Sequence, residues 1–210
     1  MDSLTEYMDL SIAYGFLNKR LFSGELPDCH LTLSVKANSY GYFRTNSYQN
    51  KQNETVTRHE IALNPCYFSR DDKAVLSTLV HEMLHLWQHV GGNDSAKVYH
   101  NAEFCAKMLV FGLQCIDSKT GQAITAGQNC TQNVINNGLF DRVAEQLIET
   151  GWKVNWQRVD DLTSQKQGKG GKGKDKSKVK FQCPQCSQAA WGKSSLNILC
   201  GICNVPMTEA

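Results

Sequence analysis

The sequence predicts an α+β fold for most of the chain, followed by a basic linker and a small cysteine-rich module. Three observations lead to this prediction: short alternating segments in the first third, longer segments with helical periodicity around them, and two pairs of cysteines near the C-terminus. The expected boundaries are 1–160 for the α+β domain, 161–180 for the linker and 181–210 for the module. At 210 residues with 41% hydrophobic content, the chain can form one sizeable core and an appendage.

Charge and cysteine content narrow the class of protein. Residues 1–160 carry 14 Lys and Arg against 17 Asp and Glu, whereas residues 161–210 carry 8 against 3. The acidic N-terminus does not resemble a signal peptide, and no apolar run approaches the roughly 18 residues of a membrane span. We expect a cytoplasmic monomer without membrane contact, nucleoid-associated if bacterial. Five cysteines are scattered without pairing rhythm, which suits a reducing compartment; they are Cys29, Cys66, Cys105, Cys115 and Cys130.

The elements before residue 69 are a helix and a small sheet. Residues 4–22 place their apolar side chains on one helical stripe. Short alternating runs then predict three strands of a small antiparallel sheet, with a polar loop at 44–57. The expected strands are 31–35, 40–43 and 60–64.

The next helix is predicted to be central. Ser69 is the expected N-cap with Asp72 as its capping-box partner, and Gly91-Gly92 ends the helix. Apolar residues lie on nearly every side between these ends, so the helix should be buried. The expected later elements are a helix from about 100 to 112, an irregular segment at 117–138, a helix at 139–150 and a strand at 152–156.

The central helix carries the motif H-E-x-x-H, at His81, Glu82 and His85. Residues four apart lie on one helix face, about 6 Å apart along the axis, so both imidazoles can bind one Zn²⁺. Glu82 points about 100° away from His81, where it can act as the general base for a zinc-activated water. A buried glutamate beside two buried histidines would be costly without a metal or polar partners. The motif therefore predicts a catalytic zinc site.

A catalytic zinc needs a third protein ligand. His89 would lie about 12 Å along the axis from His81, too far to share the ion. Position 91, where a metzincin has its third histidine, is a glycine. His100 and Glu103, which follow the Gly-Gly stop, both remain candidates, because zinc accepts either ligand type.

The motif is followed, after fourteen intervening residues, by His100-Asn101-Ala102-Glu103-Phe104. This pattern resembles the SprT family, which includes Spartan-type metalloproteases. Segments near 14–27, 138–141 and 152–156 resemble the family as well. The resemblance implies a zincin-like metalloprotease domain in which the third ligand is His100. It also implies an endopeptidase that cleaves proteins at, or crosslinked to, DNA.

The C-terminal module predicts a second, structural zinc site. Two C-x₂-C pairs separated by thirteen residues have the spacing of a zinc ribbon, in which four thiolates close a tetrahedral site. A module of about 30 residues cannot bury enough apolar surface to fold without such a metal site. The predicted ligands are Cys183, Cys186, Cys200 and Cys203.

The linker and ribbon also predict contact with DNA, either single-stranded or in DNA–protein complexes. Basic charge neutralises phosphates, and exposed aromatic rings stack on bases. Residues 166–180 hold seven lysines and one aspartate, and aromatic residues flank the cysteines. The candidate contacts are Lys172, Lys174, Lys176, Lys178, Lys180, Phe181, Trp191 and Lys193.

Two other functions stay open. The chain could be a non-proteolytic nucleic-acid-binding or regulatory protein that contains zinc, or an adaptor in which both zinc ions are structural. Glu82 argues against both, because structural zinc needs no general base. Glu82→Gln should abolish the function of a protease and leave binding or scaffolding unchanged.

Overall fold

The computed structural model describes residues 4–94, 99–159 and 179–210, which form two separate units, Met1–Asp160 and Asp161–Ala210. The predicted linker lies outside the described residues except for its last two positions, which begin the first strand of the second unit. Among the described helices, none is long and apolar enough to cross a membrane.

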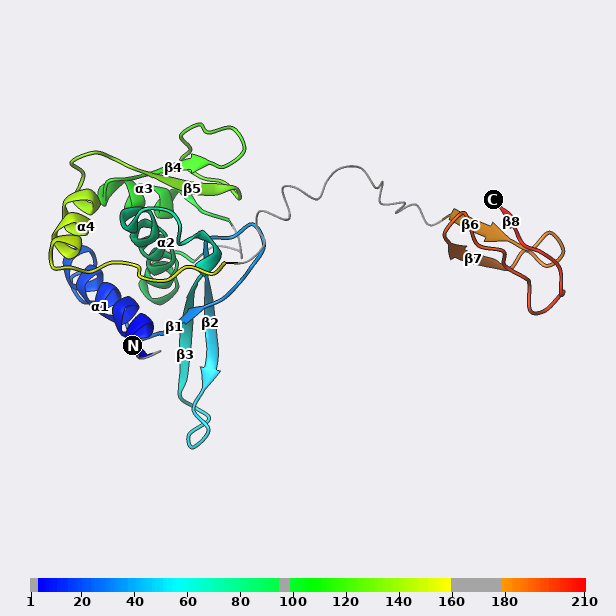
Figure 1. The fold of residues 1–210 in the computed structure, drawn as a ribbon, viewed down its shortest axis with the longest axis horizontal. Helices are drawn as coiled ribbons and strands as arrows, with labels where there is room; N and C mark the ends of the chain where they lie inside the picture. The colour runs from blue at the N-terminus through cyan, green and yellow to red at the C-terminus, as the bar shows by residue number, and fades with distance from the viewer. Residues whose placement is uncertain (1–3, 95–98, 160–178) are drawn as a thin grey trace. The chain divides into compact units, whose positions relative to one another are not determined.

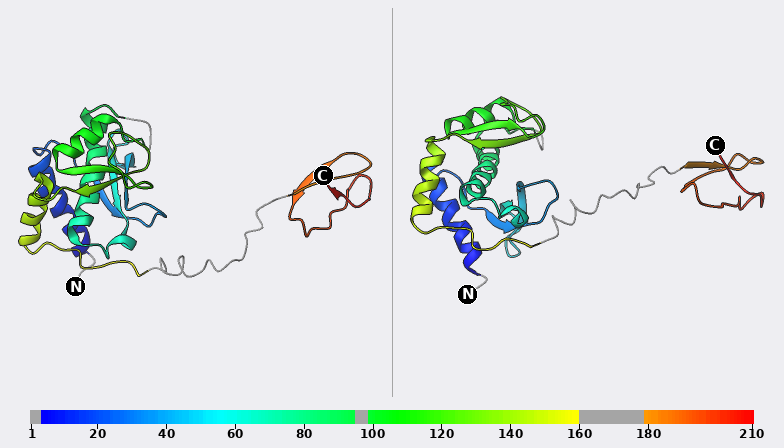
Figure 2. Two further views of the ribbon diagram at one scale, coloured as in Figure 1. Left: turned by 90° about the horizontal axis from the view of Figure 1, so that it is seen from above. Right: turned by 45° about the horizontal axis from the view of Figure 1, so that its top comes forward.

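Helix α2 (Asp72–Gly91) runs through the middle of the first unit (Figures 1 and 2). Helices α1 (Leu4–Leu21) and α4 (Leu139–Glu149) pack together beside it, and α3 (Ala102–Val110) also contacts it. A sheet packs against another side of α2, and one of its strands also contacts α1. Because α2 has neighbours on all sides, its residues from Val75 to Leu84 are all buried, as the sequence predicts.

The sheet has the strand order β1-β3-β2, formed by β1 (His30–Leu33), β2 (Gly41–Gln49) and β3 (Thr57–Leu63). The prediction of an antiparallel sheet is wrong for one pair: β2 and β3 are antiparallel, but β1 and β3 are parallel. Alternation in the sequence shows which residues share a face, but it does not show which strand lies beside which.

The polar segment 44–57, expected to be a hairpin loop, does connect two paired strands, but half of it is strand. Residues 44–49 and 57–59 extend β2 and β3 into a hairpin that projects from the unit (Figure 1). Most of these residues are exposed, so neither face has the apolar alternation from which a strand is recognised.

The start of α2 also differs from the prediction. The N-cap is Asp71, whose side chain accepts a hydrogen bond from the Ala74 N–H at 2.7 Å, and not Ser69. Asp72 closes no capping box; its Oδ1 accepts a hydrogen bond from the Val154 N–H at 3.0 Å. At the other end, Gly92 caps the helix as predicted.

The irregular segment predicted at 117–138 contains a strand. This strand is β5 (Cys130–Val134), which forms a two-stranded sheet with β4 (Leu113–Asp117) after α3. Earlier in the chain, a 3-10 turn, η1 (Pro65–Tyr67), precedes α2. Strand β5 is rich in polar residues, which hid it in the sequence, yet its backbone pairs with β4 over five positions.

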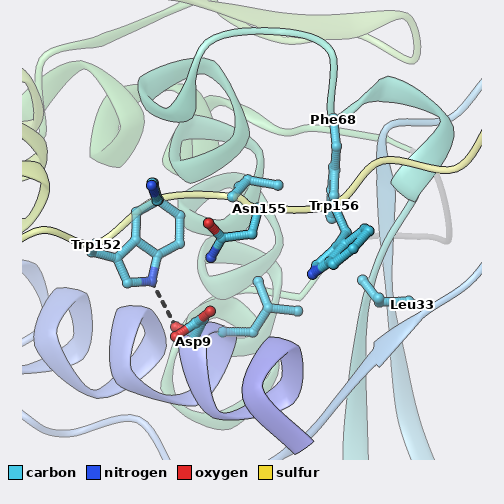
Figure 3. A pocket seen from close by; sticks show the side chains of 9 residues that line it. Asp9, Leu33, Phe68, Trp152, Asn155 and Trp156 are labelled. Carbon is cyan, nitrogen blue, oxygen red and sulfur yellow. Dashed lines mark hydrogen bonds between the residues drawn. The ribbon is translucent and has the colours of Figure 1, made fainter. Parts of the chain in front are cut away.

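The strand predicted at 152–156 does not form. Trp152 is buried and donates a hydrogen bond from its indole to the Asp9 carbonyl at 2.8 Å, whereas Trp156 is 61% exposed (Figure 3). The segment therefore ties α1 to the start of α2 without entering a sheet. The cavity that it lines has a volume of about 20 Å³, room for little more than one water molecule and too small for a substrate.

The second unit is a small three-stranded sheet with the order β7-β6-β8. Its strands are β6 (Val179–Gln182), β7 (Ala189–Gly192) and β8 (Thr208–Glu209), and both pairings are antiparallel.

Candidate metal centres

Three histidines from two parts of the first unit converge on one point. His81 and His85 lie one turn apart on α2, and His100 lies two residues before α3. One ring nitrogen of each lies within 4.8 Å of the others, and the Nε2 atoms of His81 and His100 are 3.0 Å apart. Two nitrogens on a tetrahedral zinc ion are about 3.3 Å apart. The three histidines could therefore hold a metal ion.

The surroundings keep these imidazoles neutral. Burial, reinforced by the neighbouring imidazoles, lowers the pKa of His81 well below its ordinary value and that of His85 to about 3. Burial also lowers the pKa of His100. Because a neutral imidazole is the form that binds a metal, the cluster suits a cation better than it suits protons.

Phe104, on α3, fixes the position of the three rings. Its side chain is fully buried, and its ring centroid lies 5.0 Å from His81, 4.6 Å from His85 and 4.7 Å from His100. This ring forms an apolar wall behind the cluster, which reduces the rotational freedom of all three imidazoles.

Partners of the histidines come from the segment around β5, within the stretch 117–138 whose length as an irregular segment already suggested a functional role. His81 Nδ1 lies 3.1 Å from Gln132 Oε1, and Gln132 Nε2 donates to Ser77 Oγ at 3.1 Å. His100 forms a backbone bridge with Gly127, and its Nδ1 lies 3.2 Å from the Gly127 carbonyl. These contacts orient two of the imidazoles with their Nε2 atoms toward the shared point. No local motif around Gln132 signals this role.

Glu82 is buried beside the histidines and next to β2. Burial raises the pKa of Glu82 to about 8, and Lys36 opposes the shift. A Cβ added to Gly41 would lie 3.2 Å from the Glu82 side chain and 2.8 Å from the Ala62 carbonyl. Position 41 is thus restricted to glycine mainly by the Ala62 carbonyl, and the Glu82 side chain leaves little further room.

The other candidates for the third ligand lie elsewhere. The Glu103 carboxylate accepts hydrogen bonds from the Asn93 N–H at 2.7 Å and from Gln88 Nε2 at 2.9 Å, so it stabilises the turn after α2. His89 Nδ1 lies 2.9 Å from Asp94 Oδ2 at the end of α2. Within the part of the chain that the structure describes, His100 is the candidate that joins His81 and His85.

The second unit brings four thiols together. Their Sγ atoms all lie within 4.8 Å of one another, so this cluster could also hold a metal ion. The two C-x₂-C turns have the same geometry: the Ser187 N–H donates to the Cys183 carbonyl at 3.0 Å, and the Asn204 N–H donates to the Cys200 carbonyl at 2.8 Å. Ser187 and Asn204 both have positive φ, 61° and 54°. The four thiols belong to Cys183, Cys186, Cys200 and Cys203.

Of the predicted DNA contacts, one is wrong. Phe181 is only 4% exposed and lies in the small core of the second unit, so its ring cannot stack on a base. Trp191 is 63% exposed and lies directly opposite Lys180 in the β6–β7 pair, and Lys193 is also exposed. The remaining four lie outside the described residues: Lys172, Lys174, Lys176 and Lys178.

Three of the cysteines that are scattered in the sequence also meet in the first unit. Cys105, Cys115 and Cys130 have their Sγ atoms within 4.8 Å of one another. No pattern in the sequence predicts this cluster, because its members lie on three different elements.

Comparison with known proteins agrees with this arrangement. A protein of Salmonella typhimurium described as "Uncharacterized protein in mucB 3'region" is 50% identical over 36 residues, which are 17% of this chain and about half (49%) of that relative's length. The sequence profile of the SprT-like family matches residues 13–123, just over half of the chain, and this range contains the three converging histidines and Glu82. The chain therefore belongs to the SprT-like family.

Proposed function

We propose that this chain is a zinc-dependent endopeptidase that cleaves proteins at, or crosslinked to, DNA. The observation that carries the proposal is the convergence of His81, His85 and His100 beside a buried carboxylate, Glu82. The SprT-like family is generally associated with zinc metalloprotease-like function, which supports the same reading.

The histidine cluster fits zinc by its donor set. It offers three neutral nitrogens, and a catalytic zinc takes three protein ligands with one position left open. Zinc bound here supplies a Lewis acid that polarises a carbonyl and activates water. Gln132 and the Gly127 carbonyl hold His81 and His100 in the orientation that such a site requires.

Glu82 is the proposed general base and acid. It follows His81 on α2, and β2 at Gly41 passes beside its carboxylate. Burial raises the pKa of Glu82 to about 8, and a positive ion nearby favours the ionised form. Ionised Glu82 would take a proton from the attacking water and then give it to the amine nitrogen that leaves.

The edge of β2 is the proposed docking line for the substrate backbone. In the order β1-β3-β2, one side of β2 pairs with β3, and no described strand pairs with its other side. An extended peptide can add to such an edge through main-chain hydrogen bonds. Because Gly41 at the start of β2 lies beside Glu82, a peptide held on this edge passes the catalytic carboxylate.

DNA is the proposed partner of the second unit. Residues 161–210 carry 8 basic and 3 acidic side chains, and the exposed Trp191 ring shares a sheet face with Lys180. A cation beside an exposed aromatic ring suits single-stranded DNA, because the cation neutralises a phosphate and a base can stack on the ring. The unit would concentrate the protease near DNA-bound proteins through its tether. Its four-cysteine cluster is the proposed structural zinc site.

The test is cleavage of a DNA-binding protein by the zinc-loaded full chain, with and without single-stranded DNA. We expect cleavage that DNA stimulates and that falls by about 10²–10⁴-fold in Glu82→Gln. Glu149→Gln, a matched change at an exposed position on α4, should cleave like the wild type. Absence of cleavage under every condition, with zinc and DNA both bound, would instead favour a non-proteolytic nucleic-acid-binding or regulatory protein.

A further inference from the structure

Three thiols form a cluster in the first unit, apart from the histidine centre. Cys105 comes from α3, Cys115 from β4 and Cys130 from β5, and their Sγ atoms all lie within 4.8 Å of one another. Cys115 is completely buried, Cys105 is 5% exposed and Cys130 is partly buried. Helix α3 contacts β4, which brings the third thiol to the sheet (Figures 1 and 2).

The strand register explains why the two thiols of the sheet, Cys115 and Cys130, do not form a disulfide with each other. Cys115 lies opposite Gln132, and Cys130 lies opposite Asp117, so the two cysteines share one sheet face but are diagonal neighbours. Diagonal positions are about 7–8 Å apart in an ideal antiparallel sheet, beyond the usual Cα separation of a disulfide. All three cysteines are free thiols. The placement therefore suits a shared ligand between the sulfurs better than a bond between two of them.

We propose that Cys105, Cys115 and Cys130 form a third metal site, which binds a soft cation such as Cu(I) through three thiolates. Because the three Sγ atoms all lie within 4.8 Å of one another, an ion at their centre would lie at most about 2.8 Å from each, close to the roughly 2.3 Å of a metal–thiolate bond. No fourth histidine, cysteine or carboxylate of the described residues joins the cluster. Structural zinc requires four ligands, whereas soft thiolates without a fourth donor favour Cu(I).

The protonation of the cluster supports metal binding. Hydrogen bonds from Cys115 and Cys130 stabilise the Cys105 thiolate and lower the pKa of Cys105 to about 4. The thiolate is the form that binds a metal, whereas the hydrogen bonds with Cys105 raise the pKa of Cys115 and Cys130. As the ion binds, each remaining thiol exchanges its proton for a sulfur–metal bond and releases the proton to solvent. No electron is transferred, because the ion enters and stays as Cu(I).

The cluster adjoins the segment that orients the histidine centre. Cys130 lies between Gly127, which bridges His100, and Gln132, which contacts His81. An ion shared by α3, β4 and β5 would fix this segment against the helix that begins after His100. Occupancy of the thiol site is therefore expected to raise the thermal midpoint of the first unit, because the folded state brings the three thiols together and so binds the ion more tightly than the unfolded chain.

The test is a titration of the zinc-loaded full chain with Cu(I), in competition with a chromophoric Cu(I) chelator. The four cysteines of the second unit are first replaced by serine, since they form a competing thiolate site in a separate unit. We expect one Cu(I) per chain, with an X-ray absorption spectrum that shows three sulfur neighbours. Cys130→Ser, at the least buried member of the cluster, should lose this ion, whereas the matched Cys29→Ser, also partly buried but outside the cluster, should keep it.

Three outcomes would overturn the proposal. One is an equal Cu(I) stoichiometry in Cys130→Ser and in the parent chain that carries the four serines. Another is a thiol count that reveals a disulfide within the cluster of the purified chain. A zinc ion that occupies the three thiols and resists displacement by Cu(I) would overturn the assignment to copper. Cys130→Ala and Cys29→Ala, compared by circular dichroism and thermal melting, separate loss of the ion from loss of the fold.

Discussion

Gln132 offers the sharpest test of the histidine centre, because only the tertiary structure connects it to the metal motif. Its Oε1 lies 3.1 Å from His81 Nδ1, and its Nε2 donates to Ser77 Oγ at 3.1 Å. With His81 Nε2 directed at His100, Nδ1 is the nitrogen left to donate a hydrogen bond to Gln132. Replacement of Gln132 by methionine keeps the length of the side chain but removes the acceptor.

The magnitude follows from burial. His81 is only 8% exposed, so its Nδ1–H would lose its partner in a place that water barely reaches. An unsatisfied buried donor costs about 1–3 kcal/mol. If this cost falls on the metal-bound state, zinc affinity at the histidine centre drops by about 10–100-fold, which is also the usual effect of losing such an outer partner.

Zinc affinity is measured by competition with a chromophoric chelator on the full chain. The four-cysteine site is the same in both proteins, so the difference between them reports the histidine centre. Gln114→Met is the matched control, because Gln114 lies on β4, opposite Asn133, and its side chain donates to the adjacent Cys115 carbonyl and not to a histidine of the cluster. Wild-type zinc affinity in Gln132→Met, with a weaker affinity in the control, would refute the reasoning.

Three further predictions follow from single contacts. Gly41→Ala should reduce cleavage by about 10²-fold with zinc content unchanged, because the new Cβ would clash with the Ala62 carbonyl, shift the start of β2 and crowd Glu82; unchanged cleavage would show that the carboxylate does not depend on the position of this strand. Hydrogen bonds from Lys73, which has the larger effect, and from the Asn137 N–H lower the pKa of Asp141. The ionised carboxylate therefore stabilises the folded state at pH values above its unfolded pKa of about 3.9. This contribution is lost as the pH falls through the lowered pKa of the folded state. Asp141→Asn should therefore cost on the order of 1 kcal/mol in urea unfolding at pH 7 and progressively less below about pH 4; a constant difference would contradict the assignment. Chelation of metal should collapse the NMR signal dispersion of the second unit and spare the core helices of the first, since the small unit has little buried surface; dispersed β6–β8 signals after chelation would argue against a metal-dependent fold.

Some features were predictable because they are local. The positions of His81 and His85 on one helix face follow from helix geometry, and the two C-x₂-C turns from their short spacing. The burial of α2 follows from apolar residues on nearly every side, and its end from two successive glycines. Residue logic alone left His100 and Glu103 open as the third candidate, and the family resemblance favoured His100, which the structure places beside the other two histidines.

Other features depend on residues far apart in the chain. The parallel pairing of β1 with β3 is a choice of neighbour, which alternation in a strand does not encode. The segment at 152–156 alternates like a strand, but bonds to Asp9 and Asp72 hold it across two helices instead. Phe181 is aromatic and flanks a cysteine knuckle, yet the second unit uses it as core.

By itself, the sequence determined the central helix with its paired histidines, the two cysteine knuckles and the concentration of positive charge near the C-terminus. Each of these is set by spacing within a few residues or by composition. Only the tertiary structure decided that Gln132 and Gly127 orient the histidines, that Gly41 lies against Glu82 and that three distant cysteines meet. The physical reason is that such contacts arise when separate elements pack around α2, and no pattern within one element specifies which side chains will meet there.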